Sequence, residues 1–455
     1  MLIFISRFSL AVCFTLMVGC GAGSGSANRD VSNTNNNESP PPERQFLCQA
    51  TEGFSCYYVE PNGQGDGSFS QPGSIEATLS KLKAGDYMYL FGGTYSTYYG
   101  DDARFIIHMN KYFRFSDPEP RYDAPIVIAG FPDEVAIVQG DGQRGCIFVD
   151  GQSHLEFRNF IVENCFNEGM RIGWDVPEQN ITLNEMEFRN IEYSDNSGFV
   201  YVQGYQDVTI KHSLFHDYIP KSNGQIGSYL KFFVSKNIDV VNNHFTGLGG
   251  GIYYKHGEYE PQSGGFTRIH DNVFENLTAH GVFTNQNRTE IYNNLFLNSQ
   301  GVAVHQEDGT RPPFTQDVSI HHNTFINSPL DLKQGSNDGS YMEAFGLGAK
   351  YSSVKSNVFK ESDYLIWIYG TDQQYDDGVG LESNQNCFLG TDNSAVINYF
   401  GSSTFGDKGQ VYNLSGWQAF GYDLSSIELE LELNEEYEVP VGSACDGLGW
   451  QFPSI

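Results

Sequence analysis

The motif that most constrains the fold is a short turn sequence that recurs along most of the chain. Its copies read RNFIVEN, MEFRNI, SLFHDY, NHFTGL, NVFENL, NLFLNS, NTFINS, NVFKES and NCFLGT. Their phenylalanines stand at positions 160, 188, 215, 245, 274, 296, 325, 359 and 388, at intervals of 28, 27, 30, 29, 22, 29, 34 and 29 residues. A repeat of this length indicates a solenoid, in which each coil packs against the next.

The segments before these turns alternate apolar and polar residues, as in DVTIKHSLF and DVSIHHNTF. A period of two is typical of a strand with one buried face. One coil of about 22 residues, with insertions at one corner, accounts for the intervals. The sequence therefore predicts an all-β fold, a single-stranded right-handed parallel β-helix. A β-propeller does not fit, because its four-stranded blades repeat every ~40 residues.

An asparagine stands two residues before the phenylalanine in six of the turns, at positions 243, 272, 294, 323, 357 and 386. Equivalent positions of successive coils lie about 4.8 Å apart in a parallel solenoid. We therefore expect these side chains to stack as a ladder that hydrogen-bonds its own turns, a structural role.

The N-terminus predicts export and lipid anchoring. Arg7 precedes an apolar run over residues 8–18, which is too short to span a bilayer but typical of a signal peptide. The run ends in LMVGC, residues 16–20, which resembles a bacterial lipobox with Cys20 as the acylated residue. The alternative is an exported protein that is cut nearby and released.

The predicted domain organisation follows from this N-terminus. Residues 1–20 are a lipoprotein signal peptide, and residues 21–44, rich in Gly, Ser, Asn and Pro, form a linker that cannot bury a core. Residues 45–455 form one β-helix domain. We expect a monomeric lipoprotein of the bacterial cell envelope, anchored to the outer membrane.

Net charge and cysteine content limit the binding partners and the cellular compartment that the sequence predicts for this protein. The formal net charge of −30 argues against nucleic-acid binding, since phosphate contacts need lysine and arginine. The predicted domain holds six cysteines, and an even number in an exported chain suggests disulfides. Two pairs are close in sequence and the third follows by elimination: Cys48–Cys56, Cys146–Cys165 and Cys387–Cys445. Their spacing does not resemble a zinc site.

A short helix is expected near the start of the domain, in SIEATLSKL. Ser74 can cap it, and Ile75, Leu79 and Leu82 fall on one face. The helix and the strand after it resemble the N-terminal segment of secreted right-handed parallel β-helix proteins, where such a helix covers the first coil. The C-terminal stretch from GWQAFGYDLSS to VPVGSACDGLGW resembles their closing segment.

Five strands can be superposed on successive rungs of the predicted solenoid: GSYLKF, GIYYKH, GVFTNQ, GVAVHQ and PLDLKQ. Their fifth positions form one column, Lys231, Lys255, Asn285, His305 and Lys333. Their third positions form a second column on the same face, Tyr229, Tyr253, Phe283, Ala303 and Asp331. Cations beside aromatic rings suit an anionic polysaccharide. The alternative is that the two columns form a solvent-exposed strand face without a function.

Two of these lysines, Lys231 and Lys255, would be neighbours in the first column. Ammonium groups about 5 Å apart repel by roughly 3 kcal/mol at an effective dielectric constant of 20, which would lower the pKa of one amine. A lysine with a lowered pKa can act as a general base at neutral pH.

The KHG at residues 255–257 resembles the RHG element of chondroitinase B and the related alginate lyases, which are β-helix enzymes. The general resemblance covers about residues 54–450. It implies β-elimination from a uronate polymer, with Lys255 at the catalytic arginine's position and Lys231 as the base one coil earlier. The chain departs from the pattern in two ways: lysine cannot bind a carboxylate in a bidentate manner, and NGQIGSYLK lacks the acidic pair that binds calcium in those lyases.

Further candidates complete the predicted site. His305 is a candidate acid, and Tyr253 a candidate proton donor or sugar platform, with a strand-face aromatic as the alternative. His256 is a further candidate catalytic residue, with a turn histidine that hydrogen-bonds locally as the alternative. Candidates for substrate binding are Tyr229, Asn285, Lys333, Arg268 and Arg288, although both arginines could be corner residues. Glu307 and Asp308 could bind Ca²⁺, with a solvated turn as the alternative, and no other cofactor is expected.

Three functions are compatible with these patterns. The leading hypothesis is a lyase acting on an anionic polysaccharide. The first alternative is a glycoside hydrolase, which needs two carboxylates, here from Asp331 with Glu307 or Asp308. The second is a non-catalytic surface lipoprotein that binds a glycan. The Asp-Pro-His motif expected of an epimerase on this fold is absent.

Overall fold

The computed structural model describes residues 44–98, 104–174, 178–192, 198–220, 227–255, 266–304, 317–328, 330–332, 353–362, 364–367, 382–390, 397–400, 410–419 and 421–452. Residues Leu47–Ile455 form one compact unit, separate from Met1–Phe46. Within the described ranges, no helix has the length and apolarity needed to cross a membrane. Cys20 and the proposed linker lie outside the described residues.

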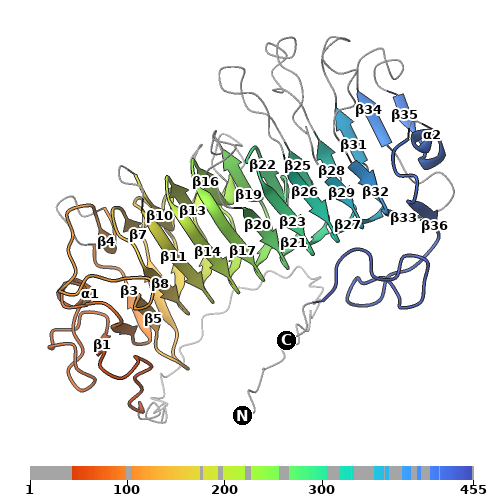
Figure 1. The fold of residues 1–455 in the computed structure, drawn as a ribbon. Coiled ribbons are helices and arrows are strands. Elements are labelled where there is room, and N and C mark those ends of the chain that lie inside the picture. Colours follow the sequence, from red (N-terminus) through yellow and green to blue (C-terminus); the bar gives the residue numbers. More distant parts are fainter. Residues whose placement is uncertain are drawn as a thin grey trace, which may run out of the picture. The chain divides into compact units, whose positions relative to one another are not determined.

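The compact unit is built from three sheets of 12 strands each within the described ranges (Figure 1). Sheet 1 contains β1 (Cys56–Val59), β2 (Tyr87–Leu90), β5 (Ile126–Gly130), β8 (Leu155–Arg158), β11 (Gln179–Asn184), β14 (Gln206–Lys211), β17 (Lys236–Val241), β20 (Thr267–His270), β23 (Thr289–Tyr292), β26 (Val318–His321), β29 (Ser353–Lys355) and β32 (Glu382–Asn384).

Sheet 2 contains β3 (Gly93–Tyr95), β6 (Ala136–Gln139), β9 (Ile161–Glu163), β12 (Glu187–Arg189), β15 (Leu214–His216), β18 (His244–Thr246), β21 (Val273–Glu275), β24 (Leu295–Leu297), β27 (Thr324–Ile326), β30 (Val358–Lys360), β33 (Cys387–Leu389) and β36 (Ile427–Leu429). It follows sheet 1 in each coil. The predicted asparagine turn joins a strand of sheet 1 to a strand of sheet 2.

Sheet 3 contains β4 (Ile107–Met109), β7 (Ile147–Val149), β10 (Met170–Ile172), β13 (Gly198–Gln203), β16 (Ser228–Phe233), β19 (Gly250–Lys255), β22 (Val282–Thr284), β25 (Val302–Val304), β28 (Leu330–Leu332), β31 (Tyr364–Trp367), β34 (Ile397–Phe400) and β35 (Gln410–Tyr412). Its last strand, β35, pairs antiparallel with β34. From β2 to β34, the chain thus passes through sheets 1, 2 and 3 in each coil.

Two short helices lie at the ends of the solenoid. In α1 (Ile75–Leu79), the side chain of Ser74 accepts a hydrogen bond from the amide of Ala77 at 3.2 Å, so the predicted cap is confirmed. Ile75 and Leu79 are buried in the same core that fills the coils. At the other end, α2 (Leu414–Gln418) buries Leu414 and Trp417 in that core.

A stack of phenylalanine rings runs through the interior. Successive ring centroids from Phe188 to Phe388 lie 5.3, 4.9, 4.9, 4.8, 4.9, 5.0 and 5.2 Å apart. The phenylalanine of the first copy of the repeat is not in this stack: Val162, not Phe160, pairs with Phe188. Phe160 is buried at the turn before β9.

The asparagine ladder is confirmed. From Asn243 to Asn357, each Nδ2 atom donates to the Oδ1 atom of the next coil's asparagine at 3.0–3.2 Å, and Asn386 is the last acceptor. Each also donates to backbone carbonyls, as Asn294 does to Ile269 (2.8 Å) and Tyr292 (2.9 Å). The ladder therefore satisfies buried backbone groups at a turn where no strand can do so.

The three predicted disulfides are present: Cys48–Cys56, Cys146–Cys165 and Cys387–Cys445. The last one ties the C-terminal tail, residues 430–452, to sheet 2. Val439 and Cys445 pack on Val358, Cys387 and Leu389. Trp450 packs farther along the same sheet on Leu295 and Leu297. The tail thus covers an apolar part of the outer face of sheet 2.

Candidate functional site

The predicted site residues divide between two sheets. Lys231, Tyr229, Tyr253 and Lys255 belong to β16 and β19 of sheet 3, and Asn285 directly follows β22. Arg268 belongs to β20 of sheet 1. Arg288 lies in the turn before β23, with a left-handed backbone (φ 55°) and its guanidinium carbon 4.7 Å from the Phe266 ring centroid. The two arginines are therefore not part of the sheet 3 face.

Several other predicted residues lie outside the described part of the chain: His256, His305, Lys333, Glu307 and Asp308. Of Lys255 and Asp331, only the backbone is described. Within the described residues, no group of three histidine, cysteine or carboxylate side chains is placed to hold a metal ion. The proposed Ca²⁺ ligands are outside that set.

The predicted pairing of Lys231 with Lys255 is wrong. Lys231 pairs with Tyr253, and Lys255 pairs with Phe233. The prediction aligned Gly227 with Gly251, whereas the amide of Gly250 donates to the carbonyl of Gly227 and the strands are shifted by two residues. Three consecutive glycines precede Ile252, and the sequence does not reveal which of them begins the strand.

The burial of two predicted residues also differs from expectation. Tyr229 is 1% exposed, and its hydroxyl donates to the carbonyls of Thr246 (2.7 Å) and Leu248 (2.9 Å). Its ring packs against Phe199 at 4.8 Å, so it is a core residue and not a substrate contact. Lys231 is 3% exposed, so the prediction of an open lysine column is wrong at this position.

The observed register creates a different set of neighbours. Arg171, Tyr201, Lys231, Tyr253 and Phe283 occupy equivalent positions on five successive strands of sheet 3. We call these five residues the sheet 3 column. Because side chains alternate between the two faces of a strand, all five belong to the same face, and cations alternate with aromatic rings along most of it.

Contacts along the sheet 3 column hold its members in place. The guanidinium carbon of Arg171 lies 3.9 Å from the Trp174 ring centroid and 4.4 Å from that of Tyr201. Arg171 also forms an ion pair with Glu168, at 2.5 Å. Lys231 Nζ lies 5.0 Å from the Tyr253 centroid, and the Tyr253 and Phe283 centroids are 4.7 Å apart. Such cation–π contacts stabilise a charge that is partly removed from water.

Accessibility is uneven along this face. Trp174 is 56% exposed at one end, whereas Tyr201 is buried, and burial raises the pKa of its phenol. Tyr253 and Phe283 are half-buried at the other end. A polymer approaching the face would therefore meet Trp174, Tyr253 and Phe283 before the buried members.

Sequence reasoning missed Arg171, Tyr201 and Trp174. The signal was present in GMRIGW and GFVYVQ, which precede the β16 strand by two coils and one coil. Both contain the alternation of the superposed strands, in Met170-Arg171-Ile172 and Val200-Tyr201-Val202. They were not superposed because Gly198 stands at a different offset from the aligned glycines, and Trp174 follows a turn glycine.

Comparisons with known proteins bear on the fold. A family model described as right handed beta helix region matches residues 139–325. The chain is a right-handed parallel β-helix. This confirms the predicted fold class, including the handedness. No curated protein matches the chain.

Three solved structures resemble this one at low identity. A pectate lyase matches with a TM-score of 0.42 and 17% identity over 73% of this chain and 79% of its own. A PL6 family alginate lyase matches with a TM-score of 0.43 and 15% identity over 88% of this chain, which spans only 59% of that enzyme. A GH136 lacto-N-biosidase from Eubacterium ramulus matches with a TM-score of 0.46 and 13% identity, over 83% and 68%. At these values the likeness concerns the fold alone.

Proposed function

We propose that the protein is an exported polysaccharide lyase that cleaves a uronate-containing polymer by β-elimination on the outer face of sheet 3. The observation that supports this proposal is the sheet 3 column, in which Arg171 and Lys231 alternate with aromatic rings. The chain carries a net charge of −30. In such an acidic molecule, the charge of Lys231 acts through its field on this face and favours the approach of an anionic polymer there.

The proposed reaction assigns three tasks. A base removes the proton at C5 of the uronate, the electron pair forms the C4=C5 bond, and the C4–O bond breaks as the leaving oxygen takes up a proton. Tyr253, half-buried on this face, is proposed to take the C5 proton and return it to the leaving oxygen. Lys255, two residues further along β19, is proposed to neutralise the carboxylate.

Lys231 has a positioning role in this proposal. Its ammonium lies 5.0 Å from the centroid of the Tyr253 ring, and this cation–π contact is proposed to hold the ring in place. With 3% exposure, it does not meet the polymer itself. This replaces the expectation that Lys231 is the general base.

A second candidate function is glycan binding without catalysis. The observation that favours it is the state of the two described cations: Lys231 is buried, and Arg171 already pairs with Glu168. In this alternative the face holds a polymer through Trp174, Tyr253 and Phe283. The hydrolase hypothesis relies on side chains at 307, 308 and 331, which the structure does not describe.

The test uses the full chain with alginate, chondroitin and pectate, and follows the absorbance of the unsaturated uronate product. We expect activity on at least one polymer. Tyr253→Phe and Lys255→Ala should each lower kcat about 100-fold or more, the usual contribution of a proton-transfer group or its partner charge. Lys211→Ala is the matched control, because Lys211 also ends a six-residue strand but belongs to sheet 1.

Two results would count against this assignment. Binding of a polymer without any rise in absorbance would favour the glycan-binding candidate. Activity that survives in both the Tyr253→Phe and the Lys255→Ala variants would remove these residues from the mechanism. Anchoring through Cys20 and an outer-membrane location belong to the same proposal, since a large polymer is met outside the cell.

A further inference from the structure

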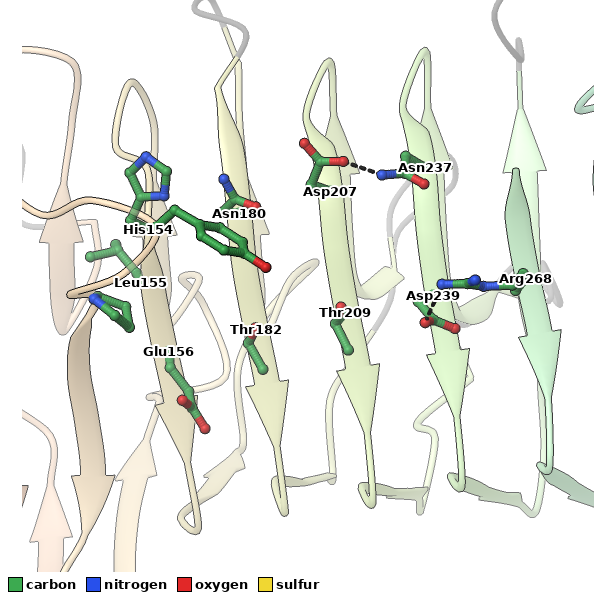
Figure 2. A pocket seen from close by; sticks show the side chains of 12 residues that line it. His154, Leu155, Glu156, Asn180, Thr182, Asp207, Thr209, Asn237, Asp239 and Arg268 are labelled. Atoms are coloured by element: carbon green, nitrogen blue, oxygen red, sulfur yellow. Dashed lines mark hydrogen bonds and ion pairs between the residues drawn. The ribbon is translucent and has the colours of Figure 1, made fainter. Parts of the chain in front are cut away.

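A hollow of about 560 Å³ lies on the outer face of sheet 1, on a different sheet from the sheet 3 column. Figure 2 shows that most of its labelled lining side chains come from the adjacent strands β8, β11, β14, β17 and β20 of this sheet. We propose that this hollow, the sheet 1 groove, is a binding site for a neutral oligosaccharide. The proposal does not depend on the chemistry proposed for sheet 3.

The floor of the sheet 1 groove explains why it is hollow. Glu156, Thr182, Thr209, Asp239 and Arg268 occupy equivalent positions on five successive strands, β8, β11, β14, β17 and β20. Two short threonines stand between long or charged side chains. Glu156 and Asp239 are three rungs apart, about 14 Å at the parallel-strand spacing. That length holds more than one pyranose ring.

The upper wall of the groove supplies hydrogen-bonding groups. Asn180, Asp207 and Asn237 stand two residues before the floor positions and also line it. The amide of Asn237 donates to the carboxylate of Asp207 (Figure 2). Carboxylate, amide and threonine hydroxyl groups side by side can accept from and donate to the adjacent hydroxyls of a sugar ring.

The charges of the groove are balanced, which decides the class of ligand. Glu156 pairs with Arg158 at 2.6 Å, and Asp239 pairs with Arg268 at 2.9 Å. Asp239 also accepts from His270 at 3.0 Å. At His154, burial lowers the pKa of the imidazole, so this side chain adds no positive charge at neutral pH.

An anionic polymer would therefore meet three carboxylates in the groove, those of Glu156, Asp207 and Asp239, without an excess of cations to attract it. A neutral sugar meets no such repulsion and can use the same carboxylates as hydrogen-bond acceptors, which are stronger than neutral ones. The sheet 1 groove and the sheet 3 column thus differ in the charge of the ligand that they suit.

The rim of the groove carries an exposed aromatic ring. Tyr122 lines the hollow and is 80% exposed. The face of an aromatic ring is negative and attracts the slightly positive C–H groups on the apolar face of a pyranose. The exposed ring of Tyr122, at the mouth of a polar groove, can therefore stack against one sugar ring.

The experiment is isothermal titration calorimetry of the full chain with cellohexaose, mannohexaose, xylohexaose and an alginate hexasaccharide. We expect at least one neutral hexasaccharide to bind. Tyr122→Ala should weaken that binding about tenfold or more, which corresponds to about 1.4 kcal/mol. Thr209→Tyr, which fills the floor, should abolish it. Tyr112→Ala is the matched control, since Tyr112 is 77% exposed and outside the groove.

Three outcomes would overturn the proposal: no neutral hexasaccharide binds at millimolar concentration, binding survives in both groove variants, or the alginate hexasaccharide is the ligand that both variants lose. Any uronate lyase activity should persist in Tyr122→Ala and Thr209→Tyr. A failure of the groove is therefore distinguishable from a failure of the function proposed for sheet 3. Thermal unfolding of each variant checks that the fold is intact.

Discussion

His270 is held between two carboxylates beside the sheet 1 groove. Its Nε2 atom lies 3.0 Å from Asp239 and its Nδ1 atom 2.5 Å from Asp271. Burial alone would lower the pKa of this imidazole, but the hydrogen bonds to Asp239 and Asp271 outweigh burial and raise the pKa to about 9. His270 is therefore protonated in the folded protein at neutral pH, and its ring stacks on Tyr292 at 4.6 Å.

This raised pKa predicts a pH-dependent stability. A group whose pKa is higher in the folded state contributes stability that is present below its unfolded value, here 6.5, and lost as pH rises through about 9. The contribution is at most about 3 kcal/mol. Chemical denaturation between pH 6 and pH 10 should show the decline in the wild type and a flatter profile in His270→Gln. Parallel profiles of the two proteins would contradict the assignment.

At the residue scale, the sequence identified the face of the sheet and the register from β19 to β28, but not the register between β16 and β19. Lys231 and Tyr253 do lie on the predicted face of adjacent strands. The shift of two residues in β19 preserves the face, because side chains alternate with a period of two, and changes only which residues are opposite. Burial of Tyr229 was not predictable, since it depends on contacts with Phe199, Thr246 and Leu248 from other parts of the solenoid and not on the strand's own pattern.

At the scale of a single element, the asparagine ladder is the part of the fold that the sequence predicted best. Asparagine recurs at a fixed offset from phenylalanine because each asparagine makes the same hydrogen bonds to the next coil. The same logic explains the error at Phe160: it precedes its strand by one residue, and Val162 takes the stacking position. A motif that resembles the repeat in letters does not always share its register.

The ladder yields a stability prediction for Asn294, which is fully buried. Asn294→Ala would leave the carbonyls of Ile269 and Tyr292 and the neighbouring ladder asparagines without their partners. We expect the free energy of unfolding to fall by about 3 kcal/mol or more, measured by denaturant titration.

A matched control is Asn298→Gly. Asn298 belongs to a second, exposed ladder, where it donates to Asn276 at 3.2 Å, and its left-handed backbone (φ 48°) suits glycine. Water can replace its partners, so the loss should stay below about 1 kcal/mol. Equal losses in the free energy of unfolding would mean that burial does not increase the contribution of the ladder hydrogen bonds to stability.

At the scale of the whole molecule, one disulfide ties the C-terminal tail covalently to sheet 2. Cys387–Cys445 closes a segment with a sequence separation of 58, whereas Cys48–Cys56 closes one of 8. In the chain-entropy treatment, the longer loop contributes about 4 kcal/mol and the shorter about 2.5 kcal/mol. The double variant Cys387→Ala/Cys445→Ala should therefore be less stable than Cys48→Ala/Cys56→Ala.

Loss of the long disulfide should also have a second effect. When the tail leaves sheet 2, Val358 and Leu389 lose their cover, and a dye that binds apolar surface should fluoresce more with this variant than with the Cys48→Ala/Cys56→Ala variant. An equal response would show that the tail stays in place without its covalent tie. The disulfide pairing itself was predictable, since two pairs were local and only one partner remained for each of the last two cysteines.

The two short helices at the ends of the solenoid have a consequence for association. Parallel strand pairing does not by itself limit the number of coils in a solenoid. The first and last strands of each sheet have unpaired amides and carbonyls that can pair with another strand. At one end α1 packs on β1, and at the other α2 packs on β35, whose pairing with β34 is antiparallel. The helices therefore cap the solenoid. Without them, the end strands of one copy could pair with those of another, and the product would be a filament rather than a discrete particle.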